Sequence, residues 1–210
     1  MSRSSYYQQL KAVARDVRFR HGLTTPRVLR SDLRRIYRAY GIQINLWPHE
    51  FKRLRGAYFD DDLGPTVMLA SGLPEDPMVF TMAHELKHHL ADRGLALYCD
   101  ASNQNEPLEI GAEVFAAEFI FPEEDFIALL GRSGIGEGEC TPEALVQLKH
   151  ETRTTLSYAG LAKRAEFLRL APAGSLASVK WKKLEERIYG EPLYKQIIRR
   201  RRARAGFRYE

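Results

Sequence analysis

The residues best suited to chemistry form the short sequence HELKH at positions 84–88. On a helix, residues four apart lie about 40° apart around the axis, so His84 and His88 can reach one ion from the same face. Glu85 stands beside them, where it can take a proton from a metal-bound water rather than bind the metal. The spacing therefore predicts a zinc (Zn²⁺) site that hydrolyses amide bonds.

A third metal ligand is expected because hydrolytic zinc usually takes three protein ligands and leaves its fourth position to water. The segment EIGAEVFAAEF begins 21 residues after His88. Glu109 and Glu113 share one helical face with two alanines, whereas Glu118 points to the opposite side. We expect Glu109 to be the third ligand. Glu113, one turn later, is expected to accept a hydrogen bond from the free nitrogen of His84 or His88. The reverse assignment of the two glutamates stays open.

Other residues of these types are expected to be structural. His89 lies about 140° from His84 around the helix, too far to join the same coordination sphere. Cys99 and Cys140 lack the spacing of a metal finger and should be small buried hydrophobes. For Tyr58, a core position is favoured over a role in stabilising an oxyanion.

The elements that must position these residues follow from apolar periodicity and from Gly and Pro breaks. Strands are expected at 41–47, 54–59 and 66–70, and helices at 5–20, 27–40, 78–91, 109–121, from 141 onward and at 157–170. This pattern predicts an α+β fold of mostly helices with a small three-stranded sheet. We expect residues 1–170 to form the catalytic domain with its helical bundle, and 171–210 to form a basic helical extension.

Composition favours a single, cytoplasmic catalytic domain. The 210 residues are 44% hydrophobic, contain two cysteines and include no apolar run near the ~20 residues that span a membrane. The net charge of +5 is concentrated in the first 40 residues and in the arginine-rich stretch 199–204. These basic ends could contact DNA or an acidic partner, or could simply be solvated.

Two segments resemble the signatures of the ImmA/IrrE metallopeptidases, over roughly residues 25–170. FTMAHELKHHL at 80–90 is similar to the family's Phe-Thr-x-Ala-His-Glu-x-x-His signature. EIGAEVFAAEFIFP is similar to its Glu-x-x-Ala-Asn-x-Phe-Ala block ending in proline. By this resemblance Glu109 matches the family's glutamate ligand. The chain has Glu113 where the family commonly has asparagine, and Lys87 where it commonly has glycine.

The resemblance implies a zincin-like fold with a small antiparallel sheet beside the active-site helix. It also implies a zinc endopeptidase of narrow specificity, whose substrate is a helix-turn-helix transcriptional repressor that controls mobile-element or stress-response genes. Two other functions remain open: a non-catalytic regulator that binds DNA or a protein, and a partner in a toxin–antitoxin pair. The helices between 141 and 170 could pass for a helix-turn-helix, although packing or substrate docking is favoured.

Overall fold

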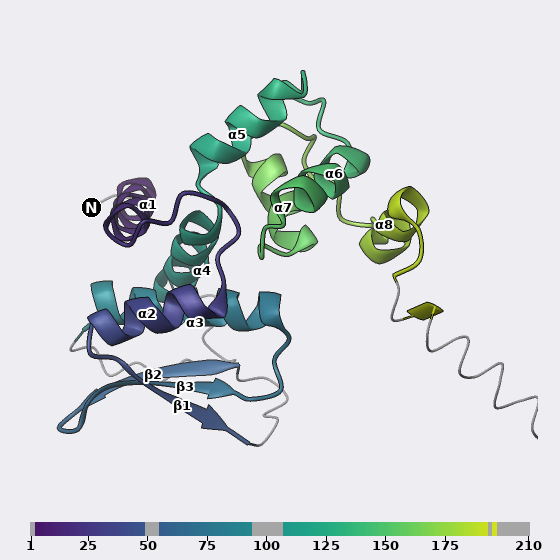
Figure 1. Cartoon of the computed structure of the whole chain (residues 1–210). Coiled ribbons are helices and arrows are strands. Elements are labelled where there is room, and N and C mark those ends of the chain that lie inside the picture. The colour runs from purple at the N-terminus through teal and green to yellow at the C-terminus, as the bar shows by residue number, and fades with distance from the viewer. Residues whose placement is uncertain (1–2, 49–54, 94–106, 193–194, 197–210) are drawn as a thin grey trace, which may run out of the picture.

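The structure of the chain is a computed structural model that describes residues 3–48, 55–93, 107–192 and 195–196. Within these residues it contains three strands and eight helices (Figure 1). The strands are β1 (Gln43–Trp47), β2 (Gly56–Asp61) and β3 (Gly64–Ala70). The helices are α1 (Arg3–Arg20), α2 (Arg30–Ala39), α3 (Glu75–Ala91), α4 (Pro107–Ile120), α5 (Glu123–Arg132), α6 (Pro142–Thr152), α7 (Tyr158–Phe167) and α8 (Trp181–Tyr189). No helix in the described part is long and apolar enough to cross a membrane. The expected α+β fold class, mostly helices with a small three-stranded sheet, is confirmed.

The three strands form a mixed sheet in the order β1-β3-β2. β2 and β3 pair as an antiparallel hairpin, whereas β1 pairs with β3 in parallel, with Ile44 opposite Val67. The expectation of a wholly antiparallel sheet was therefore wrong. The chain reverses direction between β1 and β2 and again between β2 and β3. The two reversals give β3 the same direction as β1, and because β3 lies between the other two strands, it pairs with β1 in parallel.

Helix α3 covers one face of the sheet (Figure 1). Tyr58, Val67 and Leu69 are buried on the covered face. α2 and α4 pack against α3, and α1 packs against α4. The hydroxyl of Tyr37 on α2 donates a 2.6 Å hydrogen bond to the backbone oxygen of Met82, which ties α2 to α3.

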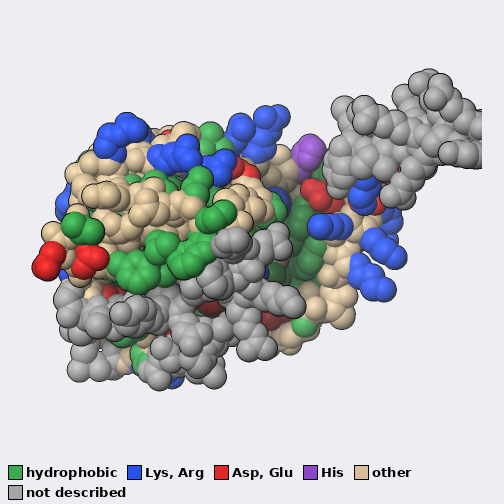
Figure 2. Space-filling view, turned by 90° about the horizontal axis from the view of Figure 1, so that it is seen from below, with side chains coloured by type: hydrophobic (Ala, Val, Ile, Leu, Met, Phe, Trp, Pro, Cys, Tyr) green, Lys and Arg blue, Asp and Glu red, His purple; other side chains and the backbone are tan. Residues whose placement is uncertain are grey.

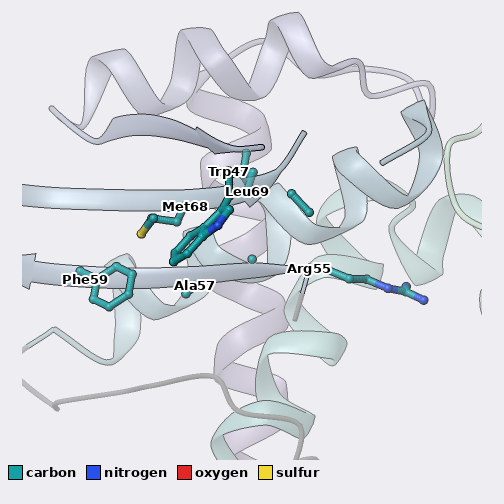
Figure 3. A pocket seen from close by; sticks show the side chains of 8 residues that line it. Trp47, Arg55, Ala57, Phe59, Met68 and Leu69 are labelled. Atoms are coloured by element: carbon teal, nitrogen blue, oxygen red, sulfur yellow. The ribbon is translucent and has the colours of Figure 1, made fainter. Parts of the chain in front are cut away.

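The opposite face of the sheet carries a shallow apolar depression of about 40 Å³. Trp47, Phe59 and Met68 are among the side chains that line it (Figure 3). Figure 2 views the molecule from this side and shows hydrophobic side chains gathered there. Ligand sites usually measure ~300–1,000 Å³, so this depression is too small to be a substrate site.

The ends of the helices agree only in part with the sequence analysis. As expected, Thr141 caps α6 by accepting a hydrogen bond from the backbone N–H of Ala144, and proline takes the first helical position. α2 begins at Arg30 rather than at 27, because Leu29 is extended and its N–H donates to the Asp32 carboxylate. α5 was not expected at all. Its acidic first turn follows Pro122 directly.

The segment after residue 170 was expected to be an extension. Its described residues pack against helices α6 and α7. The rings of Trp181 on α8 and Tyr158 on α7 are stacked, with centroids 5.2 Å apart. The Tyr158 hydroxyl donates a 2.8 Å hydrogen bond to Glu185, and Leu176 belongs to the main core. The arginine-rich stretch 199–204 lies outside the described residues.

Replacing Phe115 by alanine is expected to lower the free energy of unfolding by about 3–5 kcal/mol, because the ring is fully buried on α4 and stacks on Phe119. Ile127→Ala is the matched control, since Ile127 is 45% exposed, and should cost less than about 1 kcal/mol. Chemical denaturation measures both variants. Equal losses would contradict the placement of Phe115 in the core.

Candidate metal centre and active site

Helices α3 and α4 bring together the three side chains that the sequence predicts as metal ligands. The Nε2 atom of His84 lies 3.1 Å from Oε2 of Glu109, and Nε2 of His88 lies 3.6 Å from Oε1 of the same carboxylate. One donor atom from each side chain lies within 4.8 Å of the others. Tetrahedral zinc with bonds of ~2.0–2.2 Å needs donors roughly 3.4 Å apart, so the cluster fits that ion after small adjustments.

The charge around His84 is strongly negative. Burial lowers the pKa of His84, but the hydrogen bond to Glu109 and the charges of Glu85, Glu109 and Glu113 raise it more, so the net shift is upward. A site that stabilises a positive imidazolium also stabilises a metal cation in the same position. The surroundings of the cluster therefore favour cation binding.

Asp92 orients the second histidine of the motif. Its Oδ2 atom accepts a 2.7 Å hydrogen bond from Nδ1 of His88, which leaves Nε2 facing Glu109. Asp92 lies one turn beyond His88 on the same helical face and is almost fully buried. Glu113 lies on the wall of a neighbouring groove. Its expected contact with the free nitrogen of His84 or His88 stays a prediction.

Lys87 occupies the interior of the site, at the position where the resemblance led us to expect glycine. Its side chain is fully buried, and its Nζ atom lies 2.5 Å from Oδ2 of Asp92. The same ammonium donates a 3.0 Å hydrogen bond to the backbone oxygen of Leu108, the residue before Glu109. One buried cation therefore links the carboxylate that orients His88 to the helical turn that carries Glu109.

The side chain of Glu85 on α3 packs against Gly56, the first residue of β2. The side chain is 2% exposed. A Cβ atom on Gly56 would lie 2.7 Å from Oε1 of Glu85 and 2.5 Å from the methyl group of Thr81. Only glycine leaves room for the strand to pass this close. The sequence analysis did not identify Gly56, since its role depends on how β2 packs on α3.

His89 lies outside the cluster, as expected from its angle on the helix. Its Nδ1 atom is 3.0 Å from the hydroxyl of Tyr58 in the core. Burial, together with Arg93, lowers the pKa of His89, and burial, together with Asp60, raises the pKa of Tyr58 to about 12. Both groups are therefore neutral near neutral pH. Cys140 is buried, as expected, whereas Cys99 lies outside the described residues.

Comparison with known families agrees with this geometry. Residues 38–164 match the model of the IrrE N-terminal-like domain, peptidase family M78. This range is more than half of the 210 residues, and it includes α3 and α4 with the whole cluster. The chain therefore belongs to the IrrE N-terminal-like family, which indicates a function of the metallopeptidase type. No curated protein matches the chain.

Lys87→Met is expected to weaken zinc binding by about 10–100-fold, because it removes the cation that holds Asp92 and the start of α4 in place. Competition with a chromophoric chelator measures the affinity, and circular dichroism checks the fold. The control is Lys182→Met on α8, where the lysine is exposed. Unchanged affinity in Lys87→Met would show that Lys87 does not support the metal centre.

Proposed function

We propose that the protein is a zinc-dependent endopeptidase in which His84, His88 and Glu109 bind the metal and Glu85 is the general base. The observation that carries this proposal is the convergence of the three donor side chains beside a buried carboxylate. Membership of a peptidase family supports it. Imidazole and carboxylate donors in this number are typical of hydrolytic zinc sites.

The chain's own residues divide the chemistry between them. Bound zinc supplies Lewis acidity and lowers the pKa of water toward ~7. Glu85 takes the proton from the attacking water and delivers it to the leaving amine. Its burial between β2 and α3 limits the positions that the carboxylate can adopt. Asp92 keeps His88 in the tautomer whose Nε2 carries the free lone pair. The reaction is amide hydrolysis without a covalent intermediate.

The proposed substrate is a helix-turn-helix transcriptional repressor, and its cleavage would release mobile-element or stress-response genes. This part of the proposal is supported by the resemblance to the ImmA/IrrE metallopeptidases, now joined by the family match over residues 38–164. Narrow specificity of this kind requires contacts with the substrate beyond the metal centre.

Elemental analysis of the purified protein tests the ligands. The wild type is expected to hold about one zinc per chain, while His84→Ala and Glu109→Ala lose it, because hydrolytic zinc needs three protein ligands. His89→Ala is the control within the same helix and should keep its zinc, since His89 lies outside the cluster. No metal in the wild type even after zinc addition would favour a non-catalytic regulator. Salt-sensitive DNA binding would then be measured.

Glu85→Gln is expected to keep zinc and to abolish cleavage of helix-turn-helix repressors from the same genome, because an amide cannot accept the proton. Mass spectrometry of the products measures the cleavage. Zinc retention separates this result from loss of the site. Full activity of Glu85→Gln would remove Glu85 from the mechanism.

Gly56→Ala is expected to keep zinc but to lower kcat by about 10–100-fold, because its Cβ forces the Glu85 carboxylate or β2 to move. The control is Gly131→Ala, where a Cβ would meet nothing within 4 Å. Steady-state kinetics on the cleaved repressor compares the two variants. Wild-type kcat in Gly56→Ala would mean that Glu85 tolerates the displacement.

A further inference from the structure

A groove of about 600 Å³ runs between α1, α3, α4 and α7. Its volume falls within the ~300–1,000 Å³ that is usual for ligand sites. It is therefore large enough to hold a segment of polypeptide, unlike the small depression on the outer face of the sheet.

One end of the groove adjoins the candidate active site. Phe80 on its wall lies one turn before His84 on α3, and Glu113 lies one turn after Glu109 on α4. Arg55, a third wall residue, immediately precedes β2, whose first residue packs on α3. A polypeptide whose scissile bond lies at the cluster can thus continue directly into the groove.

The wall of the groove combines apolar side chains from three helices. Phe80 on α3, Val114 on α4 and Tyr7 on α1 are partly exposed along it. Phe167, at the far end, is 71% exposed although it is a large aromatic residue. Exposed apolar surface within a concave site is typical of a surface that another molecule covers.

The far end of the groove also has an excess of positive charge. Arg164 is 6% exposed, and its Nη1 atom has no hydrogen-bond acceptor among the described residues, although Nη2 lies 3.5 Å from Glu118. Lys163, beside it on α7, is exposed on the wall. In contrast, Lys11 on the same wall is neutralised by Glu123 at 2.6 Å. A buried donor without an acceptor is costly, so this end is suited to a ligand that supplies one.

We propose that this groove binds the substrate polypeptide beside the scissile bond. Apolar side chains of the substrate pack on Phe80 at the inner end and on Phe167 at the far end, and an acidic side chain pairs with Lys163 and Arg164. The inference rests on the proposed peptidase function and adds a substrate class, an acidic and apolar peptide segment. Glu113 and the paired carboxylate of Glu123 on the same wall disfavour the regular phosphates of a nucleic acid.

The test uses two pools of short fluorescein-labelled peptides of equal apolar content, which differ only by Glu or Gln at fixed positions. Fluorescence anisotropy measures their binding to the zinc-loaded full-length Glu85→Gln variant, which leaves the probes intact. The Glu pool should bind about tenfold more tightly than the Gln pool. Adding Lys163→Gln should remove that preference, and Phe167→Ala should weaken both pools. Lys182→Gln, an exposed lysine on α8 outside the groove, is the matched control and should change neither affinity.

Equal affinity for the two pools, or an equal effect of Lys163→Gln and Lys182→Gln, would overturn the inference. Displacement of the Glu pool by a single-stranded oligothymidylate would also overturn it, in favour of a nucleic-acid site. Selective binding of the Glu pool by a protein that cleaves nothing would overturn the proposed peptidase function alone. Cleavage of a repressor without selectivity between the pools would overturn the groove inference alone.

Discussion

The close packing of α4 on α3 is the constraint on which the candidate site depends. Two histidines on α3 cannot complete a hydrolytic metal site, and the missing carboxylate comes from α4. α4 carries the small buried residues Ala112 and Ala116, which permit a short distance between helices. On its other side, Gly111 leaves room for Leu10 and Tyr6 of α1. α4 is thereby fixed between two helices, and the position of Glu109 follows from that packing.

The same helix also connects the metal centre to the helical layer beyond it. Glu118, which the sequence analysis placed on the face of α4 opposite Glu109, is fully buried and accepts a 2.8 Å hydrogen bond from Arg15 on α1. Its second oxygen lies 3.5 Å from Arg164 on α7 and accepts from the backbone N–H of Glu123 at the start of α5. A buried carboxylate with several partners fixes the mutual arrangement of helices more than it adds net stability.

The sequence predicted what depends on a helix's own geometry and missed what depends on packing between elements. His84 and His88 were predicted to converge because spacing along a helix sets which side chains share a face, and Glu109 was expected because a hydrolytic zinc site needs a third ligand. Asp92 could have been found by the same rule, since it lies one turn beyond His88. The roles of Lys87 and Gly56 could not be predicted, because a lysine in HELKH is expected to be exposed unless another helix covers it, and a glycine within a strand can serve several purposes. The order of the strands could not be predicted either. The alternation of apolar and polar residues shows which face of the sheet each residue occupies, but not which strands are neighbours.

The walls of the groove come from residues inside and outside the range that matches the family model. Its inner end is formed by α3 and α4, inside the range 38–164 that matches the IrrE N-terminal-like family. Tyr7, Lys11 and Phe167, at the outer end, lie outside that range. Phe167 is 71% exposed, so it can be substituted without disturbing the packing of α3 and α4. In the proposed peptidase, the outer wall of the groove could therefore change its preference among substrates while the candidate ligands on α3 and α4 stay in place, so that related chains with one chemistry would accept different polypeptides.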